Sequence, residues 1–150
     1  LIGDSSAQDY LRIKQDITYS GFQDSFRFLG KQDTIAPFLA ESDIGLLTSY
    51  REGCPLFVLE ALASSVPIVG SNIGGISGIV NDQETGLLFE TANPDALINS
   101  LNTLIDDPEL RSKMGKRGLE VILEGYSRDA VISRYEKIYQ EAIRKNEGLH

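Results

Sequence analysis

The segment from Ser49 to Glu60 contains two carboxylates whose spacing suits ligand binding. Glu52 and Glu60 have seven residues between them, and Gly53-Cys54-Pro55 directly follows the first glutamate. At the tip of a loop, Glu52 can accept hydrogen bonds from sugar hydroxyls. Glu60 falls just over one turn inside the expected helix, where one carboxylate can accept from both hydroxyls of a ribose. The alternative interpretation is that Glu60 is a solvated helix residue and that the pair arose by chance.

The backbone of the same segment is suited to binding an anion. Gly53 lets a ligand approach the main chain closely, and Pro55 fits the first position of a helix. The free amides that follow would point outward. Together with the helix dipole they can hold a diphosphate without a metal ion or a lysine cluster. The sequence therefore predicts a diphosphate site at this loop and helix.

The elements around this segment indicate an α/β fold. Four short apolar runs predict strands, at 26–29, 44–48, 67–69 and 86–89. Leu1-Ile2 resembles the end of one more strand. Helical spacing relates two sets of apolar residues: Tyr10, Ile13 and Ile17, and then Ile35, Phe38 and Leu39. Apolar strands separated by helices predict a Rossmann-like, doubly wound parallel sheet with helices on both faces. Ligands bind beyond the carboxyl ends of such strands, which is where the loop after 44–48 lies.

The last third of the chain is predicted to be helical. Asn93-Pro94 and Asp107-Pro108 are typical helix starts, and Ser127 begins a final helix. Each helix carries an apolar stripe, which we expect to pack in the core. The three stripes are Leu97, Leu101, Leu104 and Ile105; Leu110, Met114, Val121 and Ile122; and Val131, Tyr135, Ile138 and Ala142.

Composition limits the class of protein. The 150 residues fit one domain, 1–150, and 14 basic against 22 acidic residues give a net charge of −8, which argues against broad nucleic-acid binding. Cys54 is the only cysteine, so no intrachain disulfide forms and a cytoplasmic location is expected. The uncharged stretch 61–81 is interrupted by glycine and proline and predicts helix, strand and loop in place of a membrane span. Because the chain starts without Met, we expect it to be part of a larger protein.

A series of motifs in this order resembles the retaining glycosyltransferases of GT-B fold, known as group 1 or family four. The motifs are Glu52-Gly53-Cys54-Pro55, Leu59-Glu60-Ala61-Leu62-Ala63, Pro67-Ile68-Val69, Gly74-Gly75-Ile76 and Thr85-Gly86-Leu87-Leu88. Weaker similarity at Phe28-Leu29-Gly30 and Asp107-Pro108-Glu109-Leu110 extends the resemblance over nearly the whole chain. It implies the C-terminal, donor-binding domain of a two-domain enzyme whose acceptor-binding domain precedes Leu1.

The resemblance implies a role for each part of the site. Glu52 would be the catalytic residue that contacts the donor sugar, and Glu60 would bind the ribose. The backbone near Gly30 and Lys31 would border the base. The diphosphate and the sugar would be held by backbone at Gly3, Gly53, Cys54, Leu56 and Phe57.

The resemblance also implies the chemistry and the partners. The donor would be a UDP- or GDP-linked sugar, and a hexosyl group would pass to a saccharide or lipid-linked acceptor with retention of anomeric configuration. No cofactor and no metal would be required. The Tyr50-Arg51-Glu52-Gly53 variant is similar to bacterial enzymes of surface-polysaccharide assembly, which implies a cytoplasmic protein at the inner face of the membrane.

Several positions depart from the family pattern. Cys54 replaces phenylalanine or leucine, which a backbone role tolerates, and we expect its thiol to be buried. Ser65 replaces a usual glycine, and Ser77-Gly78 replace Pro-Glu. Gly74-Gly75 either face the phosphates or form a tight turn. The arginine and lysine that the family uses to neutralise the diphosphate would lie upstream of Leu1.

Two other functions fit the same fold. A nucleotide-sugar epimerase would need an acid and a base around the sugar, and only Glu52 is an obvious candidate. A non-catalytic nucleotide-binding module of flavodoxin-like shape would need an acidic cluster at the strand ends, which the sequence lacks. The segment from Glu52 to Glu60 therefore favours the transferase.

Overall fold

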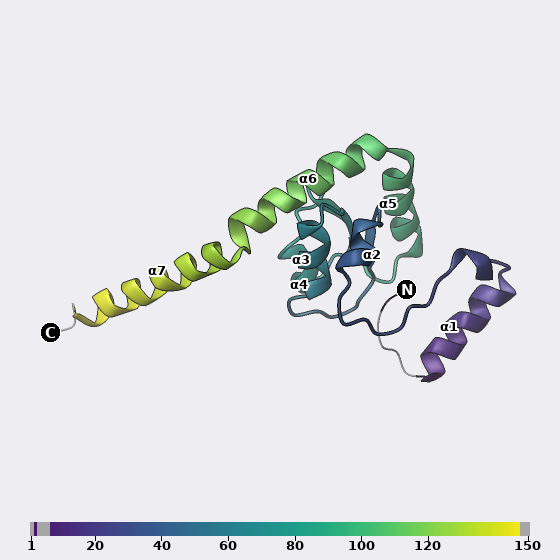
Figure 1. The fold of residues 1–150 in the computed structure, drawn as a ribbon, viewed down its shortest axis with the longest axis horizontal. Helices are drawn as coiled ribbons and strands as arrows, with labels where there is room; N and C mark the ends of the chain where they lie inside the picture. The colour runs from purple at the N-terminus through teal and green to yellow at the C-terminus, as the bar shows by residue number, and fades with distance from the viewer. Residues whose placement is uncertain (1, 3–6, 148–150) are drawn as a thin grey trace. The chain divides into compact units, whose positions relative to one another are not determined.

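The computed structural model describes residue 2 and residues 7–147 (Figure 1). The chain divides into two compact units, residues 1–35 and residues 36–150. The first unit contains α1 (Ala7–Tyr19) and the short 3-10 helix η1 (Gln23–Ser25). The second contains the parallel sheet and the candidate site loop.

The first unit confirms the predicted helix and corrects the predicted strand at 26–29. Helix α1 includes the apolar spacing of Tyr10, Ile13 and Ile17. Residues 26–29 form no strand, and the adjacent Gly30 makes only an isolated parallel bridge with Ile2. A strand needs a ladder of such pairs along a neighbour. The apolar run packs on the helix instead, where the Phe28 and Tyr10 rings meet edge to face with centroids 5.1 Å apart.

The second unit is built on a three-stranded parallel sheet. Its strands are β1 (Gly45–Leu47), β2 (Ile68–Ser71) and β3 (Gly86–Phe89), in the order β1-β2-β3. Gly45 pairs with Ile68, which pairs in turn with Gly86. The predicted strands at 44–48, 67–69 and 86–89 are therefore confirmed, with small shifts at the ends of the first two.

One face of the sheet is covered by two long helices. Val69 and Phe89 are buried together with Leu104 of α5 (Pro94–Asp106) and Met114 of α6 (Pro108–Gly125). This apolar cluster is the core that joins the C-terminal helices to the sheet.

The opposite face is covered by α3 (Leu56–Ala63) and α4 (Gly74–Ser77), and α2 (Ala36–Ala40) precedes β1. A Cβ added to Gly45 would contact the side chains of Phe57 and Ala61, and one added to Gly70 would contact Ile76. Successive residues of a strand point to opposite faces. Strand β2 is accordingly buried along its whole length, and the predicted α/β fold with helices on both faces is confirmed.

The three predicted helix starts are confirmed by their hydrogen bonds. The Asn93 side chain accepts from the Ala96 amide at 3.0 Å, and Asp107 accepts from the Leu110 amide at 2.8 Å. Ser127 Oγ accepts from the Ala130 amide at 3.3 Å, just before α7 (Arg128–Glu147). Each bond satisfies an amide that the helix itself leaves free.

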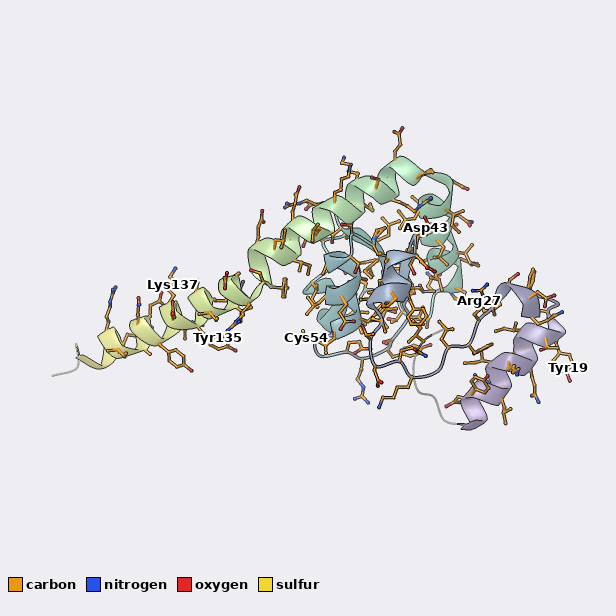
Figure 2. All side chains as sticks on the ribbon, viewed as in Figure 1. Tyr19, Arg27, Asp43, Cys54, Tyr135 and Lys137 are labelled. Carbon is orange, nitrogen blue, oxygen red and sulfur yellow. The ribbon has the colours of Figure 1, made fainter. Side chains whose placement is uncertain are left out.

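The predicted core packing of α7 is wrong. Tyr135 is 58% exposed and Ile138 is 54% exposed, and Figure 2 shows Tyr135 on this helix beside Lys137. Every residue from Ile132 to Lys145 is exposed. Ile105 of α5 is also exposed, whereas Leu104 beside it is fully buried. An apolar stripe specifies which face of a helix avoids water, but it does not specify that the same chain covers that face.

Candidate functional site

The candidate site lies at the carboxyl edge of the sheet, where two connections meet. The loop 48–55 leaves β1, and residues 72–73 lead from β2 into α4. A Cβ on Gly75 would overlap the carbonyl group of Glu52, with 2.6 Å between that Cβ and the Glu52 carbonyl carbon. The two connections are therefore in backbone contact, and only glycine allows it at this position.

The carboxylate of Glu52 is held by a neighbouring hydroxyl. Ser49 Oγ donates a hydrogen bond of 2.7 Å to Glu52 Oε1, and both residues are half-buried. No described residue forms a hydrogen bond with Oε2. One carboxylate oxygen is therefore committed to the protein and the other is available to a ligand.

The N-terminus of α3 presents free amides beside Glu52. Pro55 is the residue before the helix (φ −71°, ψ 108°) and not its first residue, so the predicted start shifts by one. The Val58 amide bonds to the Pro55 carbonyl at 3.0 Å. In the described part of the chain, the amides of Gly53, Cys54, Leu56 and Phe57 have no hydrogen-bond partner. An anion at this helix start would satisfy several of them.

Glu60 is exposed on α3 and its carboxylate is free. Its side chain forms no hydrogen bond or ion pair with the described residues. This arrangement is compatible with both earlier interpretations, a ribose ligand and a solvated helix residue.

The thiol of Cys54 is exposed, which corrects the expectation that it is buried. Cys54 lies on the loop that leads into α3 (Figure 2). Its neighbour Pro55 is buried instead. The loop therefore inserts its proline into the protein and leaves the cysteine at the surface.

The predicted base and phosphate contacts at the start of the chain belong to the other unit. Gly30 and Lys31 are exposed, and Gly30 has a left-handed backbone (φ 63°) that suits glycine. Gly3 lies outside the described residues. The structure thus brings six of the predicted site residues together on one loop and helix: Glu52, Gly53, Cys54, Leu56, Phe57 and Glu60. Gly30 and Lys31 lie in the first unit, which is described separately.

Sequence reasoning missed two contributors to the site, Ser49 and Gly75. The spacing of Ser49 and Glu52, three residues apart, is a common one for local side-chain hydrogen bonds and was the available signal. The double glycine predicts a phosphate contact or a tight turn, and the pattern does not reveal that Gly75 contacts the Glu52 backbone. Ser71, at the end of β2, is a further polar residue near this edge, and its buried hydroxyl has no partner among the described residues.

The described residues contain no group of three or more His, Cys, Asp or Glu residues arranged to hold a metal ion. None of their helices is long and apolar enough to span a membrane. On α6, Glu120 accepts a 2.9 Å hydrogen bond from Arg117 and thereby raises the pKa of that guanidinium above its usual value.

A parallel α/β sheet with a glutamate and free helix amides at its carboxyl edge defines a domain suited to binding a phosphorylated ligand. Residues 1–121 match the family described as Glycosyl transferases group 1. The chain belongs to this family, as its motifs predict.

Two curated relatives illustrate the match. N-acetyl-alpha-D-glucosaminyl L-malate synthase of Bacillus anthracis is 35% identical over 148 residues, covering 99% of this chain and 38% of the relative. N,N'-diacetylbacillosaminyl-diphospho-undecaprenol alpha-1,3-N-acetylgalactosaminyltransferase of Campylobacter jejuni is 32% identical over 117 residues, covering 78% of this chain and 31% of the relative. The chain thus spans less than two-fifths of either relative's length.

Solved structures share the fold. Sucrose-phosphate synthase of Thermosynechococcus elongatus superposes with a TM-score of 0.84 at 26% identity, covering 97% of this chain and 38% of that one. Anabaena HepE in complex with UDP has a TM-score of 0.86 at 23% identity, covering 94% of this chain and 40% of that one. The likeness to HepE shows the fold alone.

Proposed function

We propose that this chain is the donor-binding domain of an enzyme that transfers a hexosyl group from a nucleotide-diphosphate sugar. The acceptor is a saccharide or a lipid-linked saccharide, bound by a second domain, and the anomeric configuration is retained. The observation that carries the proposal is the set of free amides at the start of α3 beside the half-buried Glu52. The amides suit the diphosphate, and the carboxylate suits the sugar hydroxyls.

The names of similar proteins support this choice of substrates. HepE was crystallised with UDP and also with UDP-glucose. The relative from Campylobacter jejuni is named for an alpha-1,3 product on a diphospho-undecaprenol carrier. From a donor with an α anomeric centre, such a product requires retention. The family match disfavours both the epimerase and the non-catalytic module.

Each residue has a distinct part in the proposed site. Glu52 contacts the sugar at the reacting end of the donor. The amides of Gly53, Cys54, Leu56 and Phe57 stabilise the diphosphate, which becomes the leaving group, and they act without a change in protonation. Glu60 binds the ribose, the backbone at Gly30 and Lys31 borders the base, and Gly3 lines the phosphate end. The proposed location is the cytoplasm, at the inner face of the membrane.

A titration series tests the proposal. UDP, GDP, UDP-glucose, UDP-N-acetylglucosamine and GDP-mannose are titrated by calorimetry into the full-length gene product, and transfer to saccharide and lipid-linked acceptors is then assayed. We expect one nucleoside diphosphate and its sugar conjugates to bind and the conjugate to be consumed only when an acceptor is present. Failure of all five ligands to bind would refute the proposal. Interconversion of two sugars on the nucleotide without transfer would indicate the epimerase.

A further inference from the structure

Ser49 is placed to control the Glu52 side chain. Its hydroxyl donates to Oε1 at 2.7 Å, across three residues of the loop that follows β1. A glutamate has three rotatable side-chain bonds, and an unrestrained one loses conformational freedom each time it engages a ligand. A hydrogen bond formed before the ligand arrives removes part of that cost.

The loop backbone beneath this pair is held separately. Gly75 of α4 contacts the Glu52 carbonyl group, and Pro55 is buried at the end of the loop. We therefore expect the backbone to keep its place without the Ser49 hydroxyl. Removing that hydroxyl should release the carboxylate and leave the loop and the free amides of α3 where they are.

We propose that Ser49 is a positioning residue for donor-sugar recognition. It holds Oε1 of Glu52, so that Oε2 is left to accept hydrogen bonds from the sugar. Ser49 itself does not touch the donor. This inference rests on the proposed function, because it takes the sugar to be the ligand of Glu52.

The structural alternative is that the Ser49–Glu52 bond only stabilises the loop. In that case loss of the bond would disturb the start of α3 and would weaken binding of every ligand that uses the amides there. A positioning role predicts a loss restricted to ligands that carry a sugar. Binding of UDP and of UDP-glucose therefore separates the two roles.

The test uses three serine variants of the full-length protein. We expect Ser49→Ala to raise the Kd of UDP-glucose about five- to tenfold, because the freed Glu52 side chain must then be ordered when the sugar binds. The Kd of UDP should stay within about twofold, and Ser49→Thr, which keeps the hydroxyl, should restore UDP-glucose binding to within about twofold. In turnover, kcat should fall with Ser49→Ala and recover with Ser49→Thr.

Ser42→Ala is the matched control. Ser42 precedes β1 as Ser49 follows it, and its exposed hydroxyl donates at an equal 2.7 Å, but to the backbone carbonyl of Phe38. We expect its loss to change neither Kd. Thermal melts of all variants verify folding, and intact UDP binding by Ser49→Ala verifies the loop.

A double-mutant cycle with Glu52→Ala separates failure of this inference from failure of the proposed function. If Ser49 acts through Glu52, adding Ser49→Ala to Glu52→Ala should weaken UDP-glucose binding no further. Three results would overturn the positioning role alone. The losses of UDP-glucose affinity could be additive in the double mutant, or Ser49→Ala could weaken UDP and UDP-glucose equally. Ser49→Ala could also leave UDP-glucose binding unchanged while Glu52→Ala weakens it. A protein that binds none of the five ligands titrated above, or in which Glu52→Ala has no effect, would contradict the proposed function itself. If the protein binds GDP and GDP-mannose in place of UDP and UDP-glucose, the same outcomes are expected with that pair.

Discussion

Glu52 and Glu60 carry the same charge, but the protein holds them differently. Glu52 is half-buried with one oxygen bonded to Ser49, whereas Glu60 is exposed and its carboxylate is free of contacts with the described residues. A restrained carboxylate suits the reacting end of a donor, where geometry determines the rate. A free one suits a ribose, which has to be held but does not react.

This difference predicts separable effects of the two glutamine substitutions. Glu60→Gln should weaken binding of the nucleoside diphosphate and of the nucleotide sugar alike, by about 1.5–3 kcal/mol, because the protein loses a charged acceptor for the ribose that both ligands share. Glu52→Gln should leave binding of the nucleoside diphosphate unchanged and weaken binding of the sugar-bearing ligand only. Calorimetric titration of both ligands into both variants measures this. The control is Glu41→Gln, at an exposed glutamate just after α2.

Two outcomes would contradict these roles. Equal losses on both ligands for Glu52→Gln would remove its sugar-specific role. Unchanged affinities for Glu60→Gln would identify it as a solvated helix residue.

At the scale of elements, the contact between α4 and the loop before α3 depends on a missing side chain. A Cβ on Gly75 would overlap the Glu52 carbonyl, whereas a Cβ on Gly74 would meet nothing within 4 Å. A side chain is therefore excluded at Gly75 by the Glu52 backbone but is not excluded at Gly74. The two neighbouring glycines form a matched pair for substitution.

Gly75→Ala should displace the Glu52 loop and lower kcat/KM, whereas Gly74→Ala should leave it near wild type. Misplacement of a reacting group by about 1 Å can cost on the order of a hundredfold in rate, and we expect a loss of at least about tenfold for Gly75→Ala. Steady-state kinetics on the full-length protein provide the measurement. Equal activities of the two variants would show that the contact does not position the site.

The packing of α6 on the loop between α3 and β2 gives a second pair of glycines. A Cβ on Gly115 would overlap the carbonyl oxygen of Ser65, and Ser65 already has a left-handed backbone (φ 59°) that leaves it little freedom to move. At Gly125, on the same helix, the nearest atom to an added Cβ is the end of the Arg134 side chain at 3.9 Å.

Gly115→Ala should therefore lower the free energy of unfolding by about 1–3 kcal/mol through overpacking. Gly125→Ala should leave it unchanged or raise it by up to about 1 kcal/mol, because alanine restricts the unfolded chain. Urea unfolding of the two variants and the wild type measures both values. Similar stabilities for both variants would mean that α6 can move away from Ser65 at little cost.

At the scale of the whole molecule, the proposed site meets the charge of the diphosphate with the backbone amides at the start of α3. The proposed leaving group is stabilised by backbone donors. We therefore expect the full-length enzyme to keep its rate within about twofold when magnesium is added or when a chelator removes divalent ions, a margin small beside the usual contribution of a catalytic metal. Initial rates in EDTA and in magnesium measure this. A strict requirement for metal would count against the role assigned to the α3 amides.

The sequence by itself determined the features that depend on residues close together in the chain. The strand 86–89 follows from an unbroken apolar run, and the helix starts at Asn93 and Asp107 follow from bonds that span three residues. The site loop followed too, because a parallel sheet places the end of every strand at one edge. At the helix starts, the interaction that forms the element lies within the segment that predicts it.

Only the tertiary structure decided which surfaces meet. The contact of Gly75 with Glu52 joins residues from two different strand connections, and the exposure of Cys54 depends on its neighbour Pro55 being the residue that is buried. The apolar face of α7 is exposed, although its pattern resembles that of the buried face of α6. A local pattern specifies which residues avoid water or adopt a turn. The partner that covers them comes from a distant part of the chain, so its identity is decided when the elements pack.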